Sequence, residues 1–176
     1  MSDTPKIALI SGGSRGIGRN TALNLARRGT DVIITYRTGQ KEAKGLVDEC
    51  RAMGRNAVAL FYDANDIAAI DAFVASVQQA LATHWQTGRF DFLVNNAGVH
   101  APAPFGEITE ADFDRLSNIH FKSVLFLSQK LVPMLRDGGR ILNISTSMTR
   151  HTNPGSAAYA STVSYTHLTL PTKRIV

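Results

Sequence analysis

One stretch decides how this chain folds: Ile7-Ala8-Leu9-Ile10-Ser11-Gly12-Gly13-Ser14-Arg15-Gly16-Ile17-Gly18. Its first four residues form a short apolar run, which is typical of a buried strand, and residues 16–28 carry apolar side chains at helical spacing before Gly29. A glycine-rich loop in this position lets the backbone approach a pyrophosphate, and the helix N-terminus adds free N–H groups. Glycines can also simply mark a turn, but the strand before them and the helix after them favour phosphate binding.

The same alternation continues along the chain. We expect strands at residues 32–36, 57–62, 92–94 and 140–144, and helices at 41–53, 66–82 and 109–135. Asp66 and Thr109 are the expected N-caps, and Gly54 and Gly138-Gly139 are the expected breaks between elements. This order predicts βαβ units, and therefore an α/β fold with a doubly wound parallel sheet in a three-layer α/β/α arrangement.

Composition excludes several classes of protein. The 176 residues suit one domain, and 44% hydrophobic with 19% charged residues is typical of a soluble globular protein. No apolar run approaches the ~20 residues of a membrane span, and the polar start lacks a secretory segment, so we expect a cytoplasmic protein. The formal charge is +5, but the basic residues are scattered, which argues against nucleic acid. The single cysteine, Cys50, has no disulfide partner and no metal-ligating neighbours.

Further motifs follow the glycine-rich loop in a fixed order. Asn95-Asn96-Ala97-Gly98 comes after the fourth expected strand, a Ser/Thr cluster ends the fifth, and Tyr159 comes next. Together with the spacing of the loop glycines, these motifs resemble the short-chain dehydrogenase/reductase family over residues 5–162. The resemblance implies a Rossmann-type NAD(P)-binding domain, hydride transfer between the nicotinamide and a carbonyl or alcohol carbon of a small molecule, and a homo-oligomeric parent enzyme.

The resemblance also assigns residues to the cofactor. Those expected around its phosphates and riboses are Ser11, Gly12, Ser14, Arg15, Gly16, Ile17, Gly18, Asn95, Ala97 and Gly98. Asp63 is expected at the adenine edge, and a charge at the N-terminus of the next helix is the competing interpretation.

Cofactor choice depends on the end of the second strand. A carboxylate there would bind a ribose 2′-hydroxyl, whereas an arginine would accommodate a 2′-phosphate. This chain has Tyr36-Arg37-Thr38 at that point, and Arg15 in the glycine loop adds a second cation. NADP(H) is therefore favoured over NAD(H), although either arginine could be a plain surface charge.

The family pattern gives catalytic roles to three positions. Tyr159 would exchange a proton with the substrate oxygen, and Asn118 would hold a water in a proton relay. Ser147 is the first choice for the hydroxyl that hydrogen-bonds the substrate oxygen, with Thr146 second. His120 has no partner in sequence, so we interpret it as structural.

The motif that begins with Tyr159 is incomplete, because Val163 stands where the family has a lysine. A tyrosine hydroxyl titrates near pH ~10, and a cation one helical turn away would favour the phenolate. One explanation is a pseudoenzyme, that is, a non-catalytic NAD(P)-binding module. We favour the other, a non-native tail at 163–176, because residues 163–168 resemble a translated transposase mosaic-end sequence used in sequencing-library adapters.

On this hypothesis residues 1–162 are a truncated NAD(P)-binding domain without its C-terminal strands. The parent enzyme would be similar to a 3-oxoacyl reductase, a sugar dehydrogenase or a steroid dehydrogenase. We expect the chain as given to be inactive or nearly so.

Overall fold

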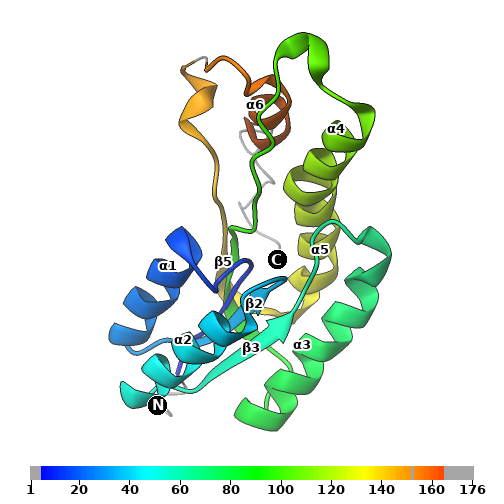
Figure 1. The fold of residues 1–176 in the computed structure, drawn as a ribbon. Coiled ribbons are helices and arrows are strands. Elements are labelled where there is room, and N and C mark those ends of the chain that lie inside the picture. The colour runs from blue at the N-terminus through cyan, green and yellow to red at the C-terminus, as the bar shows by residue number, and fades with distance from the viewer. Residues whose placement is uncertain (1–4, 152, 165–176) are drawn as a thin grey trace.

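The computed structural model describes residues 5–151 and 153–164, which form a parallel sheet with helices on both faces (Figure 1). The strands are β1 (Ile7–Ile10), β2 (Asp31–Tyr36), β3 (Ala57–Phe61), β4 (Phe90–Asn95) and β5 (Leu135–Asn143). The helices are α1 (Gly16–Arg27), α2 (Gln40–Ala52), α3 (Ile70–Trp85), α4 (Glu110–Ser117), α5 (Ser123–Leu131) and α6 (Ala157–Val163). The predicted α/β class with a doubly wound parallel sheet is confirmed.

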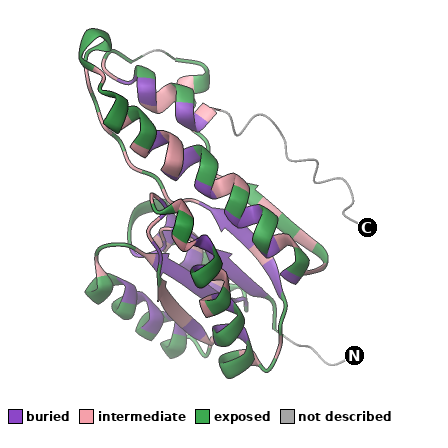
Figure 2. Ribbon diagram, turned by 90° about the vertical axis from the view of Figure 1, so that its right-hand side faces the viewer, coloured by how far each residue is buried: buried purple, intermediate pink, exposed green. Residues whose placement is uncertain are grey.

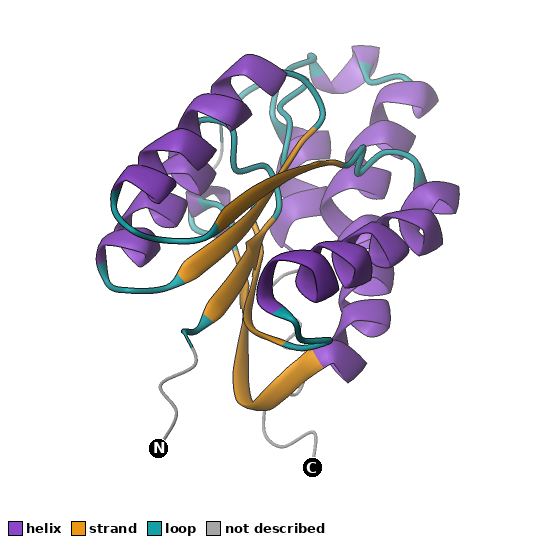
Figure 3. Cartoon of the chain, turned by 90° about the horizontal axis from the view of Figure 1, so that it is seen from below, coloured by secondary structure: helices purple, strands orange, loops and turns teal. Residues whose placement is uncertain are grey.

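Alternate side chains of each strand point to opposite faces of the sheet, and this builds two cores. From β1, Ile7 and Leu9 pack in the core that includes α3 and α5, whereas Ala8 and Ile10 pack in the core that includes α1 and α2. All four are buried, as expected for a strand covered on both faces. Figure 3 shows the sheet between its two helical layers, and Figure 2 shows how the buried residues concentrate in the strands. The three-layer arrangement is therefore confirmed.

The strand order places the loop after β1 beside the loop after β4. It is β3-β2-β1-β4-β5, so β1 pairs with β2 on one side and with β4 on the other. The chain thus adds β2 and β3 on one side of β1 and then β4 and β5 on its other side. Ligand sites of open parallel sheets lie beyond the carboxyl ends of the strands at such a switch point.

The helix predicted from residue 109 to 135 is divided in the structure. Thr109 is its N-cap, as predicted, and the hydroxyl accepts the N–H of Asp112 at 3.1 Å. A π-helical turn at Asn118–Lys122 separates α4 from α5, and α5 ends at Leu131 rather than at 135. Pro133 lies in a following 3-10 turn, because a residue without an N–H does not continue the α-helical ladder.

The fifth strand also differs from its predicted range of 140–144. β5 begins at Leu135, and Gly138-Gly139 lies inside it. The pairing with β4 is irregular there, and Gly138 has φ +78°, a conformation that glycine adopts without strain. The glycine pair therefore forms a bulge within the strand and not a turn before it.

Only the first part of the predicted tail falls within the described residues. Val163 ends α6 and Ser164 follows it, whereas residues 165–176 lie outside the described part of the chain. Within residues 5–151 and 153–164, no helix is long and apolar enough to cross a membrane. The same residues contain no group of side chains that could hold a metal ion.

A buried carboxylate joins three strands at the amino-terminal edge of the sheet. Asp91 of β4 is 2% exposed and accepts the backbone N–H of Ile7 in β1 at 2.9 Å. It also forms ion pairs with Lys6 at 3.1 Å and with Arg136 of β5 at 2.9 Å. These donors compensate for the cost of removing the carboxylate from water.

We predict that Asp91→Ala lowers the free energy of unfolding by about 3 kcal/mol, because it leaves a buried N–H and a half-buried guanidinium without their acceptor. Lys130→Ala is the matched control, since the Lys130–Asp71 pair is solvent-exposed and its loss costs less than about 1 kcal/mol. Urea unfolding of both variants measures the difference. Equal losses would show that the Asp91 network does not hold the edge together.

Candidate active site

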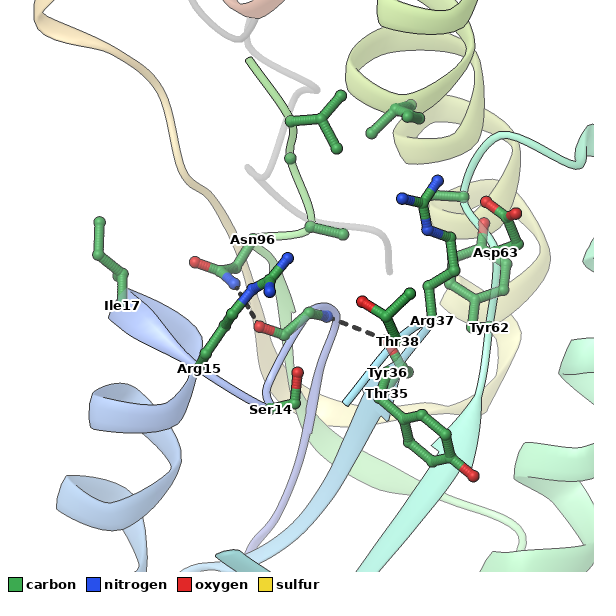
Figure 4. A pocket seen from close by; sticks show the side chains of 16 residues that line it. Ser14, Arg15, Ile17, Thr35, Tyr36, Arg37, Thr38, Tyr62, Asp63 and Asn96 are labelled. Carbon is green, nitrogen blue, oxygen red and sulfur yellow. Dashed lines mark hydrogen bonds between the residues drawn. The ribbon is translucent and has the colours of Figure 1, made fainter. Parts of the chain in front are cut away.

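A pocket of about 270 Å³ lies beyond the carboxyl ends of β1 to β4 (Figure 4). The predicted cofactor residues that line it are Gly12, Ser14, Arg15, Ile17, Tyr36, Arg37, Asp63, Ala97 and Gly98. The lining residues that the sequence did not single out as cofactor ligands are Thr35, Thr38, Tyr62, Ala64, Asn96, Val99 and Ile119. The loops after four separate strands thus meet at one site.

Glycine is required at the start of α1 for two different reasons. Gly12 and Gly16 have φ +67° and +57°, which side chains with a Cβ rarely adopt. Gly18 lies in the first turn, where a Cβ would collide with the carbonyl oxygen of Gly12 and the side chain of Asn96. The helix therefore begins directly against the loop. Its first turn contains no acidic residue, which favours an anion at this end.

Ser11 and Asn96 connect the loop after β1 to the loop after β4. The Ser11 hydroxyl accepts the N–H groups of Asn96 and Ala97 at 2.9 and 3.0 Å. The Asn96 carboxamide donates to the carbonyl oxygens of Ser11 and Gly12 at 2.9 and 3.0 Å. Ser11 is predicted as a cofactor residue, but it lies behind the pocket wall and shapes the loop. Asn96 belongs to the tetrad recognised in the sequence, yet only the structure shows that it lines the pocket.

Asn95, predicted to lie beside a ribose, is not among the residues that line the pocket. Its side chain is buried behind the pocket and donates to Ser128 of α5 at 3.0 Å and to Asn143 of β5 at 2.8 Å. Successive residues of a strand point to opposite faces, so the last residue of β4 faces α5 while the next residue can reach the glycine loop. The structure therefore does not bring the side chain of Asn95 into the pocket.

Two guanidinium groups approach the pocket from different elements. Arg15 comes from the start of α1 and Arg37 from the end of β2, and Figure 4 shows both side chains extending into the space above the glycine loop. Thr35 of β2 fixes this loop by accepting the N–H of Gly12 at 3.0 Å. Asp63 is the one acidic residue among those that line the pocket. The site thus carries net positive charge, which suits a phosphate-rich ligand.

Asp63 faces the pocket and also has a partner in the backbone. Its carboxylate accepts the N–H of Asn65 at 2.9 Å and so shapes the turn that precedes α3, while the residue also lines the pocket. The neighbouring Tyr62 is 4% exposed and stacks on Phe73, and among the described residues its hydroxyl has no hydrogen-bond partner of normal geometry. Burial raises the pKa of Tyr62 to about 12, so this phenol stays neutral.

Asn118 is the first residue of the π-helical turn. Its carbonyl oxygen accepts the N–H of Ser123, five residues later, and its carboxamide donates to Asn65 at 3.4 Å. Single π turns inside α-helices occur frequently at functional sites. The next residue along this turn, Ile119, lines the pocket, so the turn lies at the pocket wall.

Tyr159 lies in α6 between two histidine rings. The centroids of His100 and His120 are 4.9 and 5.4 Å from that of Tyr159, and both rings are nearly perpendicular to it. His120 is buried, accepts the N–H of Val99 at 3.1 Å and hydrogen-bonds Thr162 at 3.1 Å. These contacts agree with the structural role predicted for His120. No feature of the sequence pointed to His100.

The structure gives different surroundings to the two candidates for the catalytic hydroxyl. Ser147 is exposed, and its hydroxyl has no hydrogen-bond partner among the described residues. The Thr146 hydroxyl accepts the N–H of Met148 at 3.3 Å and so caps a 3-10 turn. Ser147 is thus the more exposed of the two hydroxyls, while Thr146 keeps its own O–H free to donate. Neither residue lines the pocket described above.

Val163 lies one helical turn after Tyr159 and is buried. With Asn95, His120 and Asn143 it lines a small cavity of about 20 Å³ behind the pocket. This apolar side chain brings no charge near Tyr159.

This arrangement matches the short chain dehydrogenase family, whose profile fits residues 6–168, and the chain belongs to that family of oxidoreductases. A hydroxynaphthalene reductase-like protein of Metarhizium robertsii is 36% identical over 158 residues, which are 89% of this chain and 57% of that protein. An uncharacterized oxidoreductase of Methylorubrum extorquens is 34% identical over 157 residues, which are 89% of this chain and 61% of that protein. The chain thus spans less than two thirds of the curated relatives named here.

Solved structures show the same fold. A landomycin C-6 ketoreductase with bound NADP and rabelomycin has a TM-score of 0.88 and 31% identity, and the match covers 92% of this chain and 66% of that one. A blue fluorescent protein from a metagenomic library, in complex with NADPH, has a TM-score of 0.82 and 35% identity, with 93% and 65% covered. The family assignment made from the motifs is therefore confirmed.

We predict opposite effects of alanine at two helical glycines. Gly18→Ala forces α1 away from the loop and lowers the free energy of unfolding by about 1–3 kcal/mol. At Gly45 in α2 an added Cβ meets nothing within 4 Å, so Gly45→Ala raises stability by about 0.5–1 kcal/mol. Thermal or urea unfolding measures both changes. A neutral Gly18→Ala variant would contradict the close packing inferred here.

We also predict a pH dependence that comes from His120. Burial lowers the pKa of His120 to about 4, below the value near 6.5 of an unfolded chain. The folded state then binds fewer protons, so stability is present above pH ~6.5 and is lost as the pH falls toward 4. Between pH 7 and pH 5 this group should remove about 2 kcal/mol.

The measurement is urea unfolding at pH 7 and pH 5. His120→Gln should reduce the pH-dependent loss by this amount, whereas His84→Gln, at an exposed histidine, should leave it unchanged. The same loss in both variants and the parent chain would refute the assignment.

Proposed function

We propose that this chain binds NADP(H) in the pocket at the switch point and belongs to an enzyme that transfers a hydride between NADPH and the carbonyl of a small molecule. The observation that carries the proposal is the pocket itself, with a glycine loop, a free helix N-terminus and two arginines. The end of β2 provides Arg37 and no carboxylate, which favours a cofactor with a 2′-phosphate.

The residues present suit such a cofactor. Backbone N–H groups at the start of α1 and the positive φ of Gly12 and Gly16 form a cradle for a pyrophosphate. Arg15 and Arg37 would hold the 2′-phosphate, and Asp63 would accept from the adenine edge. The NADP- and NADPH-bound structures of similar fold support the same choice.

The chemistry would take place beside Tyr159. NADPH supplies a hydride when it is bound, and the carbonyl oxygen that gains negative charge then needs a proton. Tyr159 would donate that proton, and Ser147, or Thr146 in its place, would hydrogen-bond the same oxygen. Asn118, at the π-helical turn, would hold a water that connects to this proton path.

The chain as given would perform this reaction poorly. Tyr159 needs a nearby cation to serve as acid or base near neutral pH, and Val163 provides none. The alternative, a module that binds the cofactor without catalysis, would give the same low activity. A Val163→Lys variant distinguishes the two.

The substrate proposal stays broad. A 3-oxoacyl substrate follows from the family resemblance, while the names of a hydroxynaphthalene reductase-like relative and of a ketoreductase with bound rabelomycin support an aromatic ketone. A small panel containing one ketone of each kind would separate them. A homo-oligomeric parent enzyme and a cytoplasmic location remain predictions.

The origin of residues 163–176 is a separate proposal. The family profile extends to residue 168, six residues into the proposed tail. The encoding DNA tests the idea, because a nucleotide sequence unlike the mosaic-end adapter across these codons would exclude it.

We predict that Arg37→Ala weakens NADPH binding about tenfold and leaves NADH binding almost unchanged, because only the 2′-phosphate loses its partner. Arg28→Ala removes the same charge from an exposed position outside the pocket and should change neither affinity. Fluorescence titration with both cofactors gives the values. Equal affinities for the two cofactors in the parent chain would contradict the NADP(H) assignment.

Activity is tested with Val163→Lys in the full chain. We expect ketone-dependent NADPH oxidation to appear in this variant, and adding Tyr159→Phe to reduce it about 10²–10⁴-fold. Cofactor binding without turnover, also in a Val163→Lys version extended by a native C-terminus, would favour the non-catalytic module.

A further inference from the structure

Two histidines hold α6 at its two ends. His100 comes from the loop after β4, and its Nε2 hydrogen-bonds the hydroxyl of Ser156, the residue that precedes α6, at 3.2 Å. His120 comes from the π-helical turn, and its Nδ1 hydrogen-bonds the hydroxyl of Thr162, near the end of α6, at 3.1 Å. The Tyr159 ring lies between these two attachment points and contacts both imidazoles.

The hydrogen bonds of His120 fix its tautomer. Nε2 accepts the N–H of Val99 at 3.1 Å, so it carries no proton, and Nδ1 must then donate to Thr162. The Thr162 hydroxyl in turn donates to the carbonyl oxygens of Ala158 or Tyr159, at 3.0 and 3.1 Å. A continuous chain of donors therefore runs from the loop after β4 into α6, and both His120 and Thr162 are buried.

The same loop also forms part of the cofactor pocket. Gly98 and Val99 line that pocket, and His100 follows them directly. A Cβ at Gly98 would lie 3.4 Å from Nε2 of His120, so the loop passes close over the ring. Both histidines thus connect the pocket wall to the helix that carries Tyr159.

We propose that His100 and His120 are positioning residues that clamp the Tyr159 ring and set its place relative to the cofactor pocket. Their importance for the reaction rests on the proposed function, whereas the clamp itself is a property of the folded chain. Edge-to-face packing against two rings restricts the tyrosine ring, and the two hydrogen bonds restrict the helix backbone. A general acid must stay within hydrogen-bond reach of its substrate, which is what such a clamp provides.

The test uses the full chain with 3-fluorotyrosine in place of its four tyrosines and ¹⁹F NMR. The Tyr159 signal is identified by its loss in Tyr159→Phe. In the parent chain we expect one sharp Tyr159 signal, displaced from its position in the urea-unfolded chain. The signals of Tyr36 and Tyr62 report whether each variant is folded.

The decisive variants are conservative. Thr162→Val removes the acceptor of His120 and keeps the shape of the side chain, whereas Thr162→Ser keeps the hydroxyl. His100→Ala removes one ring, and Ser156→Ala removes its hydrogen bond alone. We expect Thr162→Val and His100→Ala to broaden the Tyr159 signal or shift it toward the unfolded position, and Thr162→Ser to preserve it.

An unchanged Tyr159 signal in both Thr162→Val and His100→Ala, with the Tyr36 and Tyr62 signals at their folded positions, would overturn the proposal. In the Val163→Lys background, the same two substitutions should lower kcat several-fold and leave KM for NADPH unchanged. Because the ¹⁹F signal does not depend on turnover, a Tyr159 signal that responds to these substitutions, together with no ketone reduction by a Val163→Lys chain extended by a native C-terminus, would refute the proposed function and leave the clamp intact.

Discussion

The hydrogen bonds between Ser11 and Asn96 hold the loops after β1 and β4 against each other, and the rest of the site depends on this junction. It joins the loops after the first strands of the two halves, β1 and β4, at the switch point of the sheet. The Asn96 carboxamide also donates to the carbonyl oxygen of Gly12. Because a Cβ at Gly18 would collide with both groups, α1 can begin against this loop only with glycine at that position. One polar pair thus determines where the helix N-terminus faces.

Two sets of contacts connect this junction to Tyr159. Ala97 and Gly98 follow Asn96 along the pocket wall. His100, two residues further, hydrogen-bonds Ser156 at the start of α6. On the other side the π-helical turn brings Ile119 to the pocket wall and His120 against Tyr159. The proposed phosphate site and the proposed proton donor are therefore connected by one loop and one helical turn.

The sequence patterns were sufficient to predict the fold class. Strands that are buried on both faces produce apolar runs, and the helices carry apolar residues at regular spacing. The patterns predicted the cap at Thr109, since it acts on a neighbour three positions away. Asp66 is also a cap, but of the 3-10 turn Ile67–Ala69, and α3 begins after that turn at Ile70. The patterns failed where distant segments decide the outcome. The helix ends, the π-helical turn and the bulge at Gly138 all depend on packing or pairing with other elements. The sequence also did not reveal that the side chain of Asn95 turns toward α5, because a residue type at a motif position does not show which way its side chain points.

The sequence by itself determined the α/β architecture, the glycine loop and the family, because each rests on local spacing along the chain. The missing lysine is equally a fact of sequence, since position 163 holds valine. The tertiary structure alone decided that Asn96 rather than Asn95 faces the pocket, that Ser11 serves the loop, and that two histidines flank Tyr159. These contacts join residues between 33 and 86 positions apart, and only the folded chain brings them together.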